Sequence, residues 1–456
     1  MENFIYLKLL LLTALMLIPF IRAKGIKLYN PIILVTIVYF MQFSVPTLYM
    51  TINPELFYGF EVFPDEINNG LTFIVLVFLF FLIGYYLPDY SIAFKKGISK
   101  LIAKFPSVND YDIRIKNLPL IIIILFVAGW IARLFIIKSG VYIHTEATYK
   151  SKPLPGFELY SQLLGYGTML PYIVLVLSYY NYLKNEKKIV NLLILLFLLA
   201  VEILYAIPSG MKERILFPLV ILIFIYSLKK NLPLIIIVPV ITFTIFFVFP
   251  FTGIYRSMIL SPDLLSNVQW AINEYIKMFI HFDKSTFNLL LFSMFGERFN
   301  SAVVVVKIVE NTPAIWDFKL GYTYLVFFLS LIPRIIWHSK PHFTNIINEF
   351  GRYYGFISPV DYSTSIDMTW VGEMFINLGW FGVVFAFLYG LLYRVIYNYF
   401  MARGKLTSYG AIFYVFVLYS VIRGEMFALL FSGTLKFCFV LVVIFYPFIK
   451  RVTVRK

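Results

Sequence analysis

The sequence predicts an all-α integral membrane protein that crosses the bilayer many times. Of its 456 residues, 61% are hydrophobic and only 14% are charged, a balance that a soluble domain does not have. Apolar runs of about 18 residues or more recur along the whole chain, and each is long enough to span a bilayer as a helix. Because hydrocarbon cannot satisfy backbone polar groups, runs of this length indicate helices rather than barrel strands.

The apolar runs predict about eleven transmembrane helices, within a range of ten to twelve. The first run has no small-residue cleavage site, so we interpret it as an anchor rather than a removed signal peptide. In chain order, the expected spans cover about residues 4–21, 31–50, 71–87, 118–137, 159–183, 189–206, 215–228, 233–249, 368–397, 406–422 and 426–449.

Lysine and arginine are distributed unevenly among the loops that join these spans. Basic residues gather after the first span, in the loop 95–116 and in the C-terminal tail, whereas residues 51–70 carry four acidic residues and no basic one. The positive-inside rule therefore predicts that the basic loops and the C-terminus are cytoplasmic and that residues 51–70 lie outside. The formal net charge of +15 has the same explanation, and because no nucleic-acid-binding signature accompanies it, we do not expect nucleic acid as a partner.

Residues 251–367 interrupt the pattern with charged and amide side chains, which predicts an outer-face region of amphipathic or re-entrant helices. The stretch 322–337 fits either a full span or a re-entrant helix. The lysine and arginine distribution favours re-entry, since another crossing would leave residues 338–367 in the cytoplasm. We therefore expect three parts: a bundle of about eight spans over 1–250, the outer-face region 251–367, and a bundle of three spans over 368–456.

Eight basic residues fall on the predicted outer side, where the positive-inside rule does not account for them. They are Lys212, Arg214, Arg256, Arg298, Arg334, Lys340, Arg352 and Arg423. Guanidinium groups bind phosphate bidentately and helix N-termini add amide donors, so the group predicts a cationic cavity for the pyrophosphate of a lipid-linked sugar. The alternative is that several of them pair with acidic residues or face anionic lipid headgroups. The acidic residues considered are Glu213, Glu297, Glu310, Glu373 and Glu425.

Sugar transfer needs a base near the anomeric carbon, and a carboxylate or an imidazole can serve. The candidates are Glu373, His338, His342 and Asp367. Glu373 lies one turn into an expected membrane helix, where it could instead lock an arginine in place.

Other chemistries lack their motifs. The sequence has no phosphate-binding GxxxxGK[ST] loop, no HExxH zinc motif and no Asp-x-Asp on an early outer loop, so we expect neither a metal nor another cofactor. The single cysteine, Cys438, excludes an internal disulfide. The glycines at 379, 382 and 390 are interpreted as sites of close helix packing rather than as a ligand loop.

Four motifs in this order resemble the bacterial O-antigen and oligosaccharide repeat-unit polymerases. The motifs are Ser209-Gly210-Met211-Lys212-Glu213-Arg214, the Pro333-Arg334 to Lys340-Pro341 turn, the Gly372-Glu373 helix start with Asn377, Gly379 and Gly382, and Ile422-Arg423-Gly424-Glu425. The resemblance covers the C-terminal half of the chain. It implies a glycosyltransferase that moves a growing glycan from a polyprenyl (undecaprenyl) pyrophosphate carrier onto a newly flipped lipid-linked repeat unit. The site would face outward from the cytoplasmic membrane.

The resemblance also implies residue roles. By position in the motifs, Arg214, Arg334 and Arg423 would hold the lipid pyrophosphate, and Glu373 matches the Gly-Glu helix start. His338 departs from the usual turn, in which another residue often stands between the aromatic and the Lys-Pro pair. The expected catalytic set is Glu373, Arg423, Arg334 and His338, and the expected pyrophosphate-binding set is Lys212, Arg214, Arg256, Arg298 and Lys340. The implied partners are the lipid-linked oligosaccharide, membrane lipids and a chain-length regulator protein.

Three other classes of protein compete with this interpretation. An O-antigen ligase would share the lipid donor but use a different acceptor. A lipid-linked oligosaccharide flippase would show internal repeats and charges along several spans, and the sequence shows no repeat. A purely structural membrane protein would have little use for so many outward cations.

Overall fold

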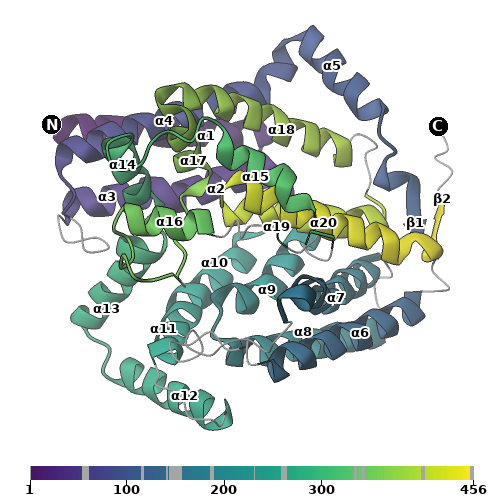
Figure 1. Ribbon diagram of the computed structural model, residues 1–456. Coiled ribbons are helices and arrows are strands. Elements are labelled where there is room, and N and C mark those ends of the chain that lie inside the picture. The colour runs from purple at the N-terminus through teal and green to yellow at the C-terminus, as the bar shows by residue number, and fades with distance from the viewer. Residues whose placement is uncertain are drawn as a thin grey trace. The chain divides into compact units, whose positions relative to one another are not determined.

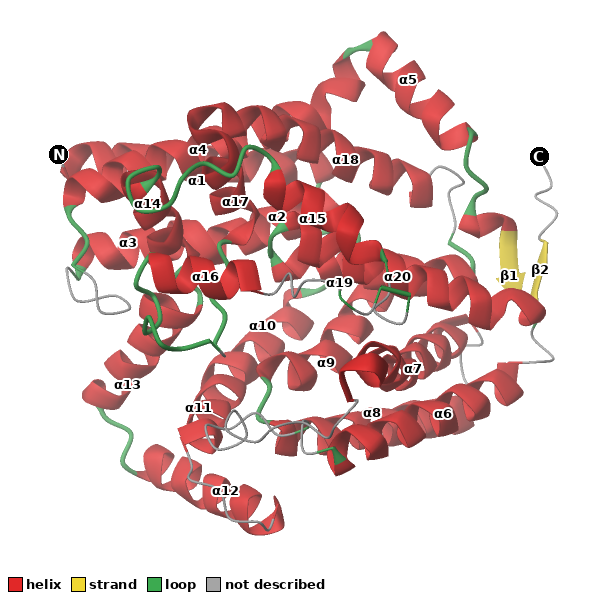
Figure 2. Ribbon diagram, in the orientation of Figure 1, coloured by secondary structure: helices red, strands yellow, loops and turns green. Residues whose placement is uncertain are grey.

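A computed structural model of the chain is built almost entirely of helices (Figures 1 and 2). It describes residues 2–53, 61–114, 118–139, 142, 157–184, 189–230, 232–257, 264–332, 336–337, 339, 345–362, 364–401 and 406–451. Within these ranges, nine helices are long and apolar enough to cross a membrane, or ten if the bent pair Lys284–Gly296 and Ser301–Asn311 is one span. The predicted class, an all-α polytopic membrane protein, is confirmed.

The chain divides into two compact units. Unit 1 comprises Met1–Ser107, Leu291–Gly404 and Phe416–Cys438, and unit 2 comprises Val108–Leu290, Lys405–Val415 and Phe439–Lys456. The expected borders at residues 250 and 367 follow changes in composition along the chain, whereas these units follow packing.

Unit 1 is formed by the first helices of the chain and by helices from its last third. They are α1 (Glu2–Ala23), α2 (Pro31–Tyr39), α3 (Val45–Ile52), α4 (Pro64–Tyr90), α5 (Ile92–Ala103), α14 (Ser301–Asn311), α15 (Tyr322–Leu331), α16 (Asn345–Tyr353), α17 (Thr369–Leu378), α18 (Val383–Met401), residues 416–423 of α19 (Ser408–Arg423) and residues 427–438 of α20 (Phe427–Phe445). Two π-helical segments, Phe40–Ser44 and Phe292–Arg298, complete it.

The core of unit 1 is the long helix α4, along which α1, α14 and α18 pack (Figure 1). Two glycines allow α4 and α18 to approach closely. A Cβ at Gly390 would lie 2.1 Å from the carbonyl oxygen of Phe81, and one at Gly84 would lie 2.0 Å from that of Phe387. Small residues at a helix crossing are the usual basis of tight packing in membranes, so the predicted packing role of Gly390 is confirmed.

A 3-10 turn interrupts the apolar segment that precedes α19. Residues Thr369–Met401 are apolar enough to form one span, but Gly379–Gly382 form a 3-10 turn between α17 and α18. Gly379 has a φ of +58°, a value that ends α17 and that a residue without Cβ adopts readily. The interruption leaves α17 as a short helix carrying Glu373.

Helix α15 is half as long as a membrane crossing requires. Its ten residues extend about 15 Å, against a hydrocarbon thickness of about 30 Å. Near its end, the Ser330 carbonyl oxygen accepts a 3.1 Å hydrogen bond from Lys436 Nζ, which lies midway along α20. This is the length expected of a re-entrant helix.

Unit 2 contains the middle of the chain. Its elements are β1 (Tyr111–Ile113), α6 (Leu118–Lys138), α7 (Phe157–Lys184), α8 (Ile189–Ala206), α9 (Lys212–Ser227), α10 (Leu234–Phe243), the π-helix Thr244–Val248, α11 (Phe249–Ser257), α12 (Leu264–Ile280), α13 (Lys284–Leu291), the remaining ends of α19 and α20, and β2 (Ile449–Arg451). Helices α6, α7, α8 and α9 pack against one another, and β1 pairs antiparallel with β2 through Tyr111 and Arg451 (Figure 2).

Candidate functional site

In unit 2, a tight turn joins α8 to α9. The 3-10 segment Ile207–Ser209 is followed by Gly210, whose φ of +66° favours glycine. The Ser209 hydroxyl donates to the Ala206 carbonyl at 2.6 Å and accepts from the Met211 N–H at 3.2 Å. The turn is therefore fixed by its own side chain, and it sets where α9 begins with Lys212.

Helix α11 packs against the same turn. The Tyr255 hydroxyl donates a 2.9 Å hydrogen bond to the carbonyl of Pro208. A Cβ at Gly210 would lie 3.7 Å from Cγ of Arg256, so the arginine stem passes beside the turn. The amino group of Lys212 lies 4.0 Å from the ring centre of Phe249, the first residue of α11. Lys212 and Arg214 at the start of α9 and Arg256 on α11, three predicted binding residues, therefore lie on elements that meet at this turn.

Arg214 has the clearest environment of the three. Its Nη1 donates to the Tyr142 carbonyl at 3.3 Å, and its guanidinium lies 5.3 Å from the centre of the Tyr142 ring. Within the described residues, no carboxylate lies within ion-pair distance of Arg214. A half-buried guanidinium that is held by a carbonyl and a ring, with no carboxylate among the described residues, is suited to an anionic ligand.

Close to this turn lies a buried ion pair that the sequence analysis missed. Arg133 of α6 donates Nη1 and Nη2 to the two carboxylate oxygens of Glu202 of α8, at 2.8 and 2.6 Å. Both side chains are almost fully buried. The signal was available, because a charge inside each of two apolar runs is unusual and marks a function or a partner.

Aromatic residues connect this ion pair to Arg214. The Arg133 guanidinium lies 4.1 Å from the centre of the Tyr205 ring. The Tyr142 hydroxyl donates to the Tyr205 carbonyl, and the Tyr142 carbonyl holds Arg214. The position of Arg214 therefore depends on the packing around the buried pair.

In unit 1, the candidate base Glu373 is fully buried on α17. One carboxylate oxygen accepts a 2.7 Å hydrogen bond from the Thr323 hydroxyl of α15, and the other accepts from the Phe427 N–H at 2.7 Å. Phe427 is the first residue of α20. Both oxygens of Glu373 are therefore engaged in joining three helices.

Asp367 lies just before α17, and like Glu373 it contacts the start of α20. Its carboxylate accepts from the Met426 N–H at 3.4 Å. Burial, together with the nearby negative charge of Glu425, raises the pKa of Asp367 to about 8. The Asp367 side chain is less buried than that of Glu373.

Arg423 closes α19 beside these carboxylates. Its guanidinium forms a 2.6 Å ion pair with Glu425, one of the pairings considered from the sequence, and its side chain is 41% exposed. Arg352, another predicted outer cation, donates to the Asn348 amide oxygen at 2.9 Å and lies 4.2 Å from the centre of the Tyr362 ring. Arg423 and Arg352 are thus each held by a neighbouring side chain of the protein.

Several predicted site residues have no described position in unit 1 or unit 2. Arg334, His338, Lys340 and His342 lie outside the described residues. Arg298 is the last residue of the π-helix Phe292–Arg298, and its side chain is not among the described parts of the structure. Among the residues that are described, no group of three or more His, Cys, Asp or Glu side chains is arranged to hold a metal ion.

The fold and these charged groups define a polytopic, all-α membrane protein with ionisable residues inside and at the ends of its apolar helices. The chain belongs to the family described as a domain of unknown function (DUF8712), which matches residues 114–456. The matched part contains both sets of candidate site residues. No curated protein and no solved structure matches the chain.

Proposed function

We propose that this protein is a membrane glycosyltransferase that polymerises polyprenyl-pyrophosphate-linked oligosaccharide repeat units into a surface polysaccharide. The observation that carries the proposal is that Lys212, Arg214 and Arg256 lie on two helices, α9 and α11, that meet at the Gly210 turn. A pyrophosphate is negatively charged, and lysine and arginine side chains bind such anions. Arg214 supports it best, since the described residues offer its guanidinium no carboxylate.

The reaction needs no external energy source. A hydroxyl of the incoming repeat unit attacks the anomeric carbon of the lipid-linked glycan, the bond from that carbon to the phosphate oxygen breaks, and the electron pair leaves on the polyprenyl pyrophosphate. The hydroxyl proton passes to a base. The cations of the Gly210 turn stabilise the charge that develops on the leaving group, which is a large catalytic contribution in transfers of this kind.

Unit 1 contains two described carboxylates that the sequence offers as bases, and each is tested there without reference to the Gly210 turn of unit 2. Glu373 corresponds to the motif position, but both of its oxygens accept hydrogen bonds from the protein. Asp367 is half-buried and its pKa of about 8 lies near neutral pH, where proton acceptance and release are both efficient. Substitution of each residue in turn distinguishes the two.

The test of the function is polymerisation in proteoliposomes supplied with a synthetic polyprenyl-pyrophosphate oligosaccharide, scored as a ladder of chain lengths. Arg214→Lys keeps the charge but loses the bidentate fork, so we expect at least a tenfold loss of kcat/KM, on the order of 1.4 kcal/mol. The matched control is Arg22→Lys, which makes the same change in an α1 arginine that is paired with Asp89. This variant is expected to polymerise normally.

The products distinguish the competing classes. Transfer of a single glycan to a different acceptor without ladder growth would indicate a ligase, and movement of the lipid across the bilayer without a new glycosidic bond would indicate a flippase. Normal ladders from Arg214→Ala would contradict the pyrophosphate role of the Gly210 turn.

We further propose that the protein lies in the cytoplasmic membrane with the C-terminus and the loop 95–116 in the cytoplasm and the active site facing outward. The lysine and arginine distribution supports this orientation. In a Cys438→Ser background, an impermeant thiol reagent applied to whole cells should label Glu61→Cys and leave Lys100→Cys unlabelled. Labelling of Lys100→Cys instead would reverse the topology.

A further inference from the structure

Helix α5 has the sequence of a helix that lies in a membrane surface. Phe94, Ile98 and Leu101 share one face at helical spacing, and only Ile98 is buried, whereas Phe94 and Leu101 are 41% and 44% exposed. Residues 92–107 carry four lysines, at 95, 96, 100 and 104, and no acidic residue. An exposed apolar stripe combined with lysines is the pattern of interfacial helices that bind anionic lipid surfaces.

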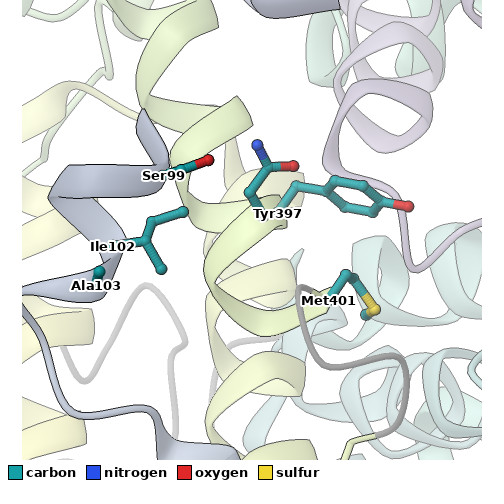
Figure 3. A pocket seen from close by; sticks show the side chains of 6 residues that line it. Ser99, Ile102, Ala103, Tyr397 and Met401 are labelled. Atoms are coloured by element: carbon teal, nitrogen blue, oxygen red, sulfur yellow. The ribbon is translucent and has the colours of Figure 1, made fainter. Parts of the chain in front are cut away.

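A cavity lies between this helix and the end of α18. It has a volume of about 430 Å³ and is lined by Ser99, Ile102 and Ala103 of α5 and by Tyr397, Asn398 and Met401 of α18. The side chains of Ser99 and Ile102 extend from α5 toward α18 (Figure 3). The volume lies within the range of small-molecule sites, about 300–1,000 Å³, and the lining mixes apolar groups with a hydroxyl and an amide.

The charges around this end of unit 1 are consistent with an anionic occupant. α5 follows directly after α4, and the carboxylate of Asp89 near the end of α4 pairs with both Arg22 and Arg394. Asp89 is thus already matched by two arginines. The lysines of α5 add to this positive charge.

We propose that α5 lies in the membrane interface and, together with α18, holds one anionic phospholipid. The lipid phosphate lies among the α5 lysines, and an acyl chain enters the cavity beside Ile102, Ala103 and Met401. Two observations favour a lipid over a free phosphate. The stripe of Phe94 and Leu101 is exposed and needs an apolar environment, and the apolar side of the cavity would have no use in binding an inorganic ion.

This site is independent of the proposed polymerase reaction, so it is tested by lipid binding alone. Full-length protein, delipidated in detergent, is titrated with phosphatidylglycerol or phosphatidylcholine of the same short chain length. Bound lipid is counted by native mass spectrometry and the thermal midpoint is followed in parallel. We expect phosphatidylglycerol to bind at least tenfold more tightly and to raise the midpoint.

Variants separate the phosphate from the acyl chain. Lys96→Gln with Lys100→Gln should weaken phosphatidylglycerol binding about thirtyfold, at about fivefold per lysine near an anionic lipid. Ala103→Phe, which fills the cavity and keeps every lysine, should lose the retained lipid. Lys277→Gln with Lys284→Gln removes the same charge from α12 and α13 of unit 2 and is expected to change binding less than twofold.

Three outcomes would overturn the proposal. They are equal binding of the two lipids by the unchanged protein, equal weakening by the control pair of lysines, and displacement of phosphatidylglycerol by millimolar inorganic phosphate. The first needs no variant, so it remains decisive even if a substitution prevents folding.

Discussion

Glu373 and Phe427 are joined by a 2.7 Å hydrogen bond in which the Phe427 N–H donates to the carboxylate. The neighbouring Met426 N–H donates to Asp367 at 3.4 Å. The first N–H groups of any helix have no partner within it, so these two carboxylates cap the start of α20. The residues that the sequence offers as bases are therefore also structural, and experiments must separate the two roles.

The Glu373→Gln variant separates them at one position. Its amide oxygen can keep the bond to Phe427, and its amide nitrogen can face the Thr323 hydroxyl, which also accepts from Asn377. We expect a thermal midpoint within a few degrees of the parent and no polymer, because an amide cannot accept the hydroxyl proton. Glu373→Ala loses both bonds and should be less stable by about 1–3 kcal/mol. Normal ladders from Glu373→Gln would leave Glu373 as a cap alone.

Asp367 predicts a pH dependence of stability. Its pKa is raised to about 8 in the folded protein, chiefly by burial, so the folded state holds this proton more tightly than the unfolded state. The contribution to stability is fully present below the ordinary carboxyl pKa of about 4 and is lost as pH rises toward 8. Thermal midpoints measured from pH 5 to pH 9 should fall with pH in the parent and fall less in Asp367→Asn. Parallel profiles for the two proteins would remove Asp367 as the cause.

The buried pair of Arg133 and Glu202 predicts strong coupling. Removing one partner, as in Arg133→Met or Glu202→Leu, leaves the other charge buried and should cost about 3–5 kcal/mol. The double variant should recover most of this loss, which a thermal double-mutant cycle measures. The exposed pair of Lys277 and Glu274 is the control, and breaking it should cost less than about 1 kcal/mol. Additive losses at Arg133 and Glu202 would contradict the coupling.

Arg423 is expected to be essential for polymer formation while its partner is not. Arg423→Ala should remove ladders at normal protein abundance if the reaction requires this cation of unit 1, and Glu425→Gln should retain them because it leaves the guanidinium in place. Both variants are scored in the proteoliposome assay. Equal loss in the two variants would mean that the reaction requires the ion pair itself rather than the guanidinium of Arg423 alone.

Part of the candidate site could be predicted from local sequence. A Ser-Gly turn followed by Lys212 and Arg214 places both cations at the start of α9, because the left-handed glycine reverses the chain there. The packing role of Gly390 was also predictable, since a missing side chain is useful where two helices cross. The proximity of Arg256 to this turn was not, because it depends on the packing of α11.

The sequence by itself determined that the chain is a helical, many-span membrane protein, because the length and apolarity of each segment are local properties that a bilayer selects. Only the tertiary structure decided which polar groups meet inside it. Arg133 pairs with Glu202 across 69 residues of sequence, and Glu373 reaches the backbone of Phe427 across 54. A buried charge must find a partner wherever the packed helices supply one, and the local pattern around each residue does not encode which helix that will be.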